Sequence, residues 1–184
     1  MRSDETLAKG IQAGQTEAMQ LLVDRYYDAI LRYVFRMTGG RQTLAEDMVQ
    51  ESFLKMIRGI ATYDSDQPFR PWLYAIATNV VRNHYRLADT QRTISTDVET
   101  FELQTGTLSP ENTLEDTESH IAVADALMRL PEHQRAVVVL YYYEDMSQKD
   151  ISDLLGIPVG TVKSRLSIGL KRLREMLMKV DGIS

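Results

Sequence analysis

The sequence contains no cysteine, so it can form neither a disulfide nor a thiolate metal site. Its three histidines, His84, His120 and His133, have no partner at metal-ligand spacing, and we expect no metal and no cofactor. No apolar run approaches the roughly 18 residues that span a bilayer, and the residues after Met1 lack the apolar stretch of a signal peptide. These absences predict a cytoplasmic protein.

The sequence also lacks the two-residue alternation of β-strands and any internal repeat. Apolar residues recur instead at spacings of three and four, which predicts an all-α protein. The stretches with this period are residues 21–37, 45–57 and 71–87. Gly39-Gly40 is expected to end the first helix, and residues 61–71, rich in Asp, Ser and Pro, are typical of a loop.

Large apolar residues and periodicity are both scarce between residues 88 and 118. Residues 93–119 contain acidic but no basic side chains, and their net charge is −7. A segment of this composition cannot bury enough apolar surface to fold by itself, so we expect a flexible acidic linker at residues 91–119. It would join one small helical domain at residues 1–90 to a second at residues 120–184.

The net charge of −5 argues at first against binding nucleic acid, but the charges are unevenly distributed. Residues 67–92 carry a net charge of +3 and residues 158–184 carry +4, on either side of the acidic segment. Clustered Lys and Arg residues are typical of phosphate-binding surfaces. The sequence therefore offers two candidate nucleic-acid-binding surfaces, one in each domain.

The second basic stretch lies within a pattern that predicts a helix-turn-helix at residues 147–180. Ser147 can cap a short helix, and Gly156 can end it. A second helix is expected from about Val159, with its leucines in one stripe and a basic, polar face opposite them. A short helix, a glycine-containing turn and a helix with such a face fit the major groove of DNA.

The alternative is an ordinary helical hairpin whose charged face is only solvated. A basic amphipathic helix alone would favour that interpretation. The capped preceding helix, the glycine turn and the small residues Gly160, Thr161 and Ser164 near the contact end favour DNA binding instead.

Two blocks of the sequence form a more specific pattern. The first is AEDMVQESFL at residues 45–54, followed by FRPWLYAIATN at residues 69–79. The second is LPEHQR at residues 130–135, followed by residues 147–156 and by GTVKSR at residues 160–165. Together they resemble the bacterial RNA polymerase sigma factors of the extracytoplasmic-function group. In that family the first block belongs to region two, which docks on core RNA polymerase and opens the −10 promoter element. The second belongs to region four, which reads the −35 element.

For docking on the polymerase, the resemblance points to Asp47, Gln50 and Glu51. Their spacing of three and four residues places them on one face of a helix, away from Val49 and Phe53. A polar, acidic face can pair with basic residues on the clamp helices of the polymerase's largest subunit. Without the resemblance, a merely solvated face would be the favoured interpretation.

For the −10 element, the resemblance points to the loop and helix at residues 63–86. Melted DNA requires stacking surfaces, a pocket for an extruded base and cations along the strand. The residues that match the base pocket are Phe69 and Asn79, and those that offer a basic, aromatic surface are Arg82, Asn83, Tyr85 and Arg86. Trp72 shares its side of the helix with apolar residues, so we expect it in the core.

For the −35 element, the residues that match base-facing positions are Lys163, Ser164 and Ser167, and those expected to contact phosphates are Arg165, Lys171 and Arg174. A lysine can reach guanine acceptors, whereas serine is permissive. The family pattern continues with an aromatic residue or His, then Arg, Ala and Arg, where this chain has Ser-Ile-Gly-Leu at residues 167–170. This departure lowers the local positive charge and predicts weak promoter binding by the free protein.

These observations predict a dissociable initiation factor that recruits core RNA polymerase to a subset of promoters and helps melt the −10 DNA. The resemblance also implies a cognate anti-sigma factor, which could hold the protein at the membrane. No Ser/His/Asp set, Gly-rich phosphate loop or metal cluster indicates an enzyme, and no small-molecule substrate is expected.

Two other classes of protein share part of this pattern. A free-standing helix-turn-helix regulator would bind operators as a dimer, with its N-terminal domain as a ligand-binding or dimerisation module. The polar block from Asp47 to Glu51 and the basic stretch at residues 69–86 are not needed in such a protein. A nucleic-acid enzyme would need clustered acidic residues at a metal site, which the sequence does not suggest.

Overall fold

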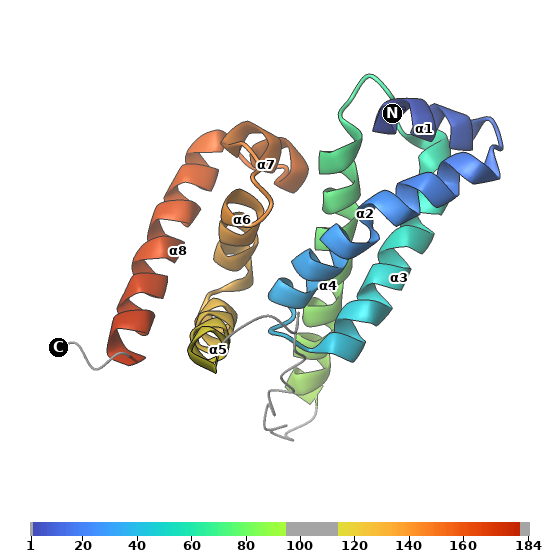
Figure 1. The fold of residues 1–184 in the computed structure, drawn as a ribbon. Coiled ribbons are helices and arrows are strands. Elements are labelled where there is room, and N and C mark those ends of the chain that lie inside the picture. The colour runs from blue at the N-terminus through green and yellow to red at the C-terminus, as the bar shows by residue number, and fades with distance from the viewer. Residues whose placement is uncertain (1, 95–113, 181–184) are drawn as a thin grey trace.

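The structure of the protein, a computed structural model, describes residues 2–94 and 114–180. The regular elements in these two ranges are all helical, which confirms the predicted all-α class (Figure 1). In chain order they are α1 (Asp4–Gln12), α2 (Thr16–Met37), α3 (Gln42–Gly59), the 3-10 turn η1 (Ile60–Thr62), α4 (Phe69–Ile94), α5 (Leu114–Arg129), α6 (Glu132–Tyr142), α7 (Gln148–Leu155) and α8 (Val159–Val180). Across the described residues, no helix combines the length and the apolar character that crossing a membrane requires.

Helices α1 to α4 pack together as the N-terminal domain (Figure 1). The buried residues of α2 and α3 follow the three- and four-residue spacing of the sequence. The rings of Tyr33 and Tyr74 are fully buried and meet edge to face, with their centroids 5.2 Å apart. The Tyr33 hydroxyl shares a hydrogen bond of 2.7 Å with Thr78 Oγ1, so its polar end is satisfied inside the core.

The turn between α2 and α3 depends on the two glycines expected there. Gly39 and Gly40 have φ angles of +70° and +81°, a left-handed conformation that other residues adopt only with strain. The Gly40 N–H donates to the Phe35 carbonyl at 2.9 Å, which closes the end of α2. A Cβ on Gly39 would lie 2.5 Å from Cγ of Met128, so this glycine also allows the C-terminal domain to approach closely.

Helix α4 begins two residues earlier than predicted because a side chain from α1 caps it. The Phe69 N–H donates to Glu5 Oε1 at 3.2 Å. Hydrogen bonds from the Glu5 and Phe69 backbone N–H groups lower the pKa of Glu5, which keeps the capping carboxylate charged. Pro71 lies in the first helical turn, where its missing N–H costs no hydrogen bond.

Helices also occupy both ends of the segment predicted as a linker, residues 91–119. Helix α4 continues to Ile94, and α5 begins at Leu114, so the linker bounds from sequence are too wide. Residues 95–113, where the rest of the predicted linker falls, lie outside the described residues.

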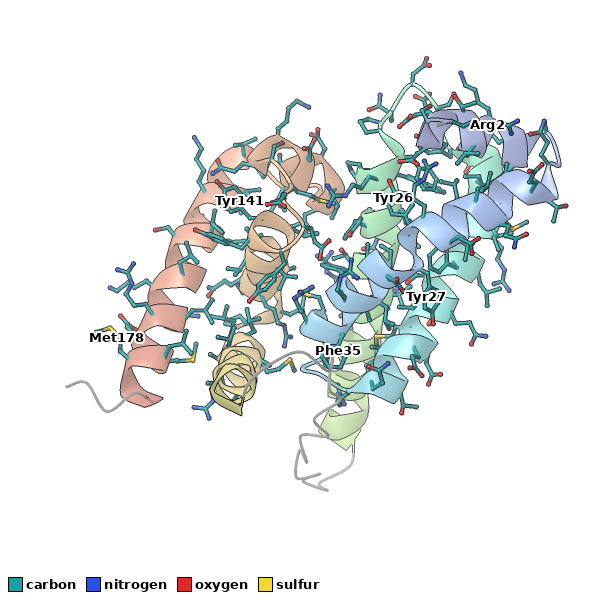
Figure 2. All side chains as sticks on the ribbon, viewed as in Figure 1. Arg2, Tyr26, Tyr27, Phe35, Tyr141 and Met178 are labelled. Atoms are coloured by element: carbon teal, nitrogen blue, oxygen red, sulfur yellow. The ribbon has the colours of Figure 1, made fainter. Side chains whose placement is uncertain are left out.

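Helices α5 to α8 form the C-terminal domain, and α6 is its central helix (Figure 1). All residues from Gln134 to Leu140 are buried, on every side of α6. One side packs on α8, where a Cβ on Gly169 would lie 2.9 Å from Cγ2 of Val138. The other side packs on α2, and side chains of both domains fill the space between these helices (Figure 2). The two predicted domains are therefore in contact with each other.

The helix-turn-helix has the caps that the sequence predicts. Ser147 Oγ accepts the Asp150 N–H at 3.1 Å, and its hydroxyl donates to Asp150 Oδ2 at 2.7 Å. Gly156 ends α7 in the left-handed conformation, with φ +64°. Helix α8 then begins at Val159, the predicted residue.

Ser147→Ala should lower the free energy of unfolding by about 1 kcal/mol, because the first turn of α7 loses its capping acceptor. Ser147→Thr keeps the hydroxyl and should retain most of the stability. Urea denaturation of both variants beside the wild type, followed by circular dichroism, measures the difference. Equal stabilities for the alanine and threonine variants would contradict the capping role.

Candidate polymerase and nucleic-acid interfaces

The exposed face of α3 carries the three residues that the sequence assigns to polymerase docking. Asp47, Gln50 and Glu51 are all exposed, and the buried residues of α3 lie on its other side. Glu51 forms an ion pair with Lys55 one turn later, with 2.8 Å between Oε1 and Nζ. Exposed pairs of this kind contribute little to stability, so Glu51 can exchange Lys55 for a cation of a partner.

Two exposed apolar residues extend the same face, and sequence reasoning missed both. Leu54 is 48% exposed, and Ile57 beside it is 37% exposed. Ile57 belongs to the periodic apolar stretch of residues 45–57, which predicts a buried side chain, and that prediction is wrong. Both side chains are accessible to a bound protein.

Four of the residues predicted to bind the −10 element form one stripe on α4. Asn79 lies three and four residues before Arg82 and Asn83, and these lie four and three residues before Arg86, which places all four on one helix face. The two asparagines and Arg86 are exposed, and the Arg82 side chain is 41% exposed. The stripe presents amide and guanidinium donors along a line, an arrangement suited to a polynucleotide strand.

Tyr85 lies beside this stripe and is half-buried between two arginines. Arg41 Nη2 donates to its hydroxyl at 3.0 Å. The guanidinium carbons of Arg41 and Arg135 lie 5.9 Å and 5.5 Å from the centre of the Tyr85 ring. The His84 ring meets that of Tyr85 edge to face at 5.6 Å, and burial together with the charge of Arg41 lowers the pKa of His84.

Phe69 does not reach the surface, contrary to its predicted place in the base pocket. Its side chain is 0% exposed and packs between the rings of Tyr26, Tyr63 and Trp72, with centroid distances of 5.7, 5.5 and 5.5 Å. The first residue of α4 turns its side chain into the domain because this aromatic cluster offers more apolar contact than the solvent side. Phe69 can therefore support a pocket from behind, but it cannot touch an extruded base in this conformation.

Trp72, which was expected in the core, is only partly buried. Its ring packs on that of Tyr63, with 4.7 Å between the centroids, at the outer edge of the aromatic cluster. By helical spacing it lies on the same face of α4 as Asn79, seven residues later. An exposed edge of tryptophan at one end of the polar stripe offers a stacking surface that the sequence did not predict.

The loop before α4 is held in place by α1. Gln12 Nε2 donates to the carbonyl oxygens of Ile60 and Tyr63, each at 2.9 Å. The Tyr63 hydroxyl in turn donates to the Gln67 carbonyl, and burial raises the pKa of Tyr63 to about 12, so the donor stays protonated. Sequence reasoning missed Gln12 because a polar residue at the end of an amphipathic helix carries no distinguishing pattern.

Most of the residues predicted to bind the −35 element lie on one exposed face of α8. These residues are Lys163, Ser164, Ser167, Lys171 and Arg174. Lys171 Nζ is 4.0 Å from Glu175 Oε1, a loose and exposed pair. Arg165 departs from the group, because it is half-buried and lies about 200° around the helix from Lys163. It can reach phosphates only at the edge of a groove.

The departure from the family pattern at residues 167–170 has a structural reason at one position. Gly169 lies against Val138 of α6, so the packing requires a very small residue there. Ile168 is 46% exposed, so its apolar side chain is not part of the core. Nearby Arg172 donates to Gln134 Oε1 at 3.1 Å, so it turns toward α6 rather than toward the −35 face.

Comparison with known proteins assigns both halves of the chain. The model of sigma-70 region 2 matches residues 22–91, and the model of sigma-70 region 4 matches residues 120–173. The ECF RNA polymerase sigma factor SigW of Bacillus subtilis is 33% identical over 92% of this chain and 94% of its own length. The ECF RNA polymerase sigma-E factor of Escherichia coli is 33% identical over 89% of this chain and 88% of its own.

Solved structures agree with these relatives. The structure of CnrH in complex with the cytosolic domain of CnrY matches with a TM-score of 0.73 and 26% identity, over 100% of both chains. The sigma factor RpoE from Bartonella quintana, solved in complex with the anti-sigma factor NepR, has a similar fold, with a TM-score of 0.67, 22% identity, and coverage of 86% of this chain and 95% of its own. The chain therefore belongs to the extracytoplasmic-function sigma factors, which direct RNA polymerase to initiate transcription at specific promoters.

Proposed function

We propose that this sigma factor docks on core RNA polymerase through the exposed face of α3 and reads promoter DNA with α4 and α8. Family membership supports the activity, and the exposed residues support the division of roles among the three helices. The observation that carries the proposal is that each helix exposes polar or charged residues at the matched positions and buries its other side.

Docking would begin with the carboxylates of Asp47 and Glu51, which can pair with basic residues on the clamp helices of the largest polymerase subunit. The neighbouring Leu54 and Ile57 would add apolar contact, because both are exposed beside the acidic residues. Charges steer the encounter, whereas buried apolar area gives most of the lasting affinity. The α3 face offers both kinds of contact.

At the −10 element, the stripe of Asn79, Arg82, Asn83 and Arg86 would follow the separated strand. Guanidinium groups neutralise phosphates, and asparagine amides can form hydrogen bonds with base edges. Tyr85 and the exposed edge of Trp72 would supply stacking surfaces beside the stripe. Phe69 would act only by supporting the loop and Trp72 from within the domain.

At the −35 element, Lys163, Ser164 and Ser167 would face the bases, and Lys171 and Arg174 would contact phosphates. Few cations remain on this face, since Ile168 and Leu170 replace the arginines of the family pattern. Binding would therefore depend on the polymerase, which raises the effective concentration of α8 at its site once α3 has docked.

The protein would perform no chemistry itself, because the polymerase forms the RNA. A cognate anti-sigma factor would keep it inactive in the cytoplasm or at the membrane. Support for this control comes from similar structures, since the Bartonella sigma factor was solved in complex with the anti-sigma factor NepR, and CnrH with the cytosolic domain of CnrY.

A free-standing helix-turn-helix regulator is the main competing function. It would need its helix-turn-helix face for stand-alone DNA binding and would have no use for the α3 face. The low positive charge around Ile168 and the extended polar and apolar face of α3 both favour the polymerase-dependent factor.

Mixing the full chain with purified core polymerase tests the proposal directly. The two should co-elute from a size-exclusion column, and the complex should transcribe a promoter that core polymerase alone does not use. Separate elution in the absence of any anti-sigma factor would reject the proposed function.

Asp47→Ala should weaken core polymerase binding about tenfold, because it removes an exposed carboxylate that has no intramolecular ion pair in the described part of the chain. Glu51→Ala should have a smaller effect, because Lys55 already neutralises that carboxylate. Glu17→Ala is the control, since this exposed glutamate lies on another helix, in the first turn of α2. Biolayer interferometry gives the three dissociation constants, and an equal loss for Glu17→Ala would disprove a specific face.

Ile168→Arg should strengthen binding of duplex DNA about threefold to tenfold and should steepen the salt dependence by about 0.9 per added phosphate contact. The side chain is 46% exposed, so the change should cost little stability. Ile168→Gln is the uncharged control and should leave the salt slope unchanged. Fluorescence anisotropy at several salt concentrations distinguishes the two, and identical slopes would contradict the placement of this edge near phosphate.

A further inference from the structure

A buried glutamate joins the two domains directly after α6. The Glu144 side chain is 7% exposed, although it is charged and lies in a short loop. The Tyr74 hydroxyl of α4 donates to its Oε2 at 2.5 Å, and Arg70 Nη2 donates to its backbone carbonyl at 2.5 Å. Nη1 of Arg36 lies 3.7 Å from Oε1, and Nη2 of Arg70 lies 3.9 Å from Oε2. All three partners belong to the N-terminal domain.

Glu144 differs from the acid of a surface ion pair because its side chain is buried among its partners. Burial raises the pKa of Glu144, and the Tyr74 hydroxyl and the charges of Arg36 and Arg70 oppose that effect. The adjacent Tyr143 adds a further contact, because its ring lies 4.3 Å below the guanidinium of Arg36. A desolvated carboxylate depends on its partners, so a change that removes one of them weakens the contact strongly.

The other end of α6 covers two residues of the proposed −10 surface. Nε of Arg82 lies 3.7 Å from Oε1 of Glu132, at the start of α6. The guanidinium of Arg135, which is 4% exposed, lies over the ring of Tyr85. Glu132 pairs with the partly exposed Arg82, and Arg135 occupies a face of the Tyr85 ring, so both residues of α6 compete with a DNA strand for these groups. The spacing of Glu132, Ala136, Val139 and Tyr143 places these residues on one face of α6, toward the N-terminal domain.

We propose that Glu144 is the clasp of a closed state in which the C-terminal domain of the free sigma factor masks Arg82 and Tyr85 of the −10 surface. Engagement of the −10 strand then requires Glu144 to leave Tyr74, Arg36 and Arg70. The masking rests on the proposed function of Arg82 and Tyr85, whereas the clasp itself does not. If DNA binds only the open state, its apparent affinity equals the intrinsic affinity multiplied by the fraction of open molecules. Weakening the Glu144 contacts raises that fraction and should therefore tighten DNA binding.

The clasp is tested with Glu144→Gln in the full chain, which removes the charge and preserves the shape. Asp145→Asn is a closely matched control: it removes the same charge one residue later, from an exposed side chain, and asparagine tolerates the φ of +48° at this position. Small-angle X-ray scattering should give a larger radius of gyration for Glu144→Gln than for the wild type or Asp145→Asn. Phenylglyoxal should modify Arg82 at least about threefold faster in Glu144→Gln, as measured by mass spectrometry.

Unchanged compactness and an unchanged Arg82 modification rate in Glu144→Gln would overturn the clasp. Tyr74→Phe serves as a second variant if Glu144→Gln does not fold, because it removes only the hydroxyl that donates to Glu144. It should accelerate the Arg82 reaction by a smaller factor, and an unchanged rate in this variant would also count against the clasp.

The masking is measured separately, by anisotropy with a fluorescent random-sequence 20-nucleotide single strand. Glu144→Gln should bind this strand about threefold to tenfold more tightly than Asp145→Asn. Adding Arg82→Gln to Glu144→Gln should abolish most of that gain. If Glu144→Gln opens but binds the single strand no more tightly, the proposed masking of the −10 surface is wrong. If it binds more tightly with or without Arg82, the proposed −10 role of Arg82 fails and the clasp stands.

Discussion

The arrangement of the two domains follows from one constraint, the burial of α6 on every side. Its residues from Gln134 to Leu140 leave no polar stripe that could face water. A single neighbouring helix can cover only one side of α6, and α8 covers the side that carries Val138. The remaining sides need α5 and the N-terminal domain, and burying one valine such as Val139 stabilises the contact by about 1.5–3 kcal/mol. The domains therefore pack together because α6 cannot satisfy its apolar surface within its own domain.

This packing brings charged residues into a partly dry interface, where their pairing determines how the domains fit. Glu132, the first residue of α6, pairs with Arg82. Glu144, two residues after the end of α6, pairs with Arg36 and Arg70. Buried ion pairs contribute little net stability because desolvation cancels much of the attraction, but a mismatched arrangement would leave a charge unpaired. The apolar contacts of α6 thus supply most of the favourable contact between the domains, and the ion pairs keep the charged groups at their edge from being left unpaired.

The sequence predicted what depends on local patterns. The period of α2 and α3, the glycine turn at Gly39-Gly40 and the cap at Ser147 all required only nearby residues, and the structure confirms them. The early start of α4 was not predictable in this way, because its cap comes from Glu5, 64 residues away. Phe69 and Ile57 were misplaced for a related reason. A helical period shows that a residue is apolar, but the neighbours that cover it are distant in sequence.

The exposed faces of the helices show how packing and function compete for the same positions. On α8, Gly169 serves the contact with α6, and Leu170 lines a shallow apolar groove with Tyr142 and Leu177. Gly169 has no room for a larger side chain, so that position cannot carry a DNA-binding cation. On α3 the core uses only one side of the helix, and the other side is free to hold both acidic and apolar residues. Packing therefore leaves more freely variable positions on the exposed face of α3 than on α8, which agrees with the proposed dependence of α8 on polymerase docking.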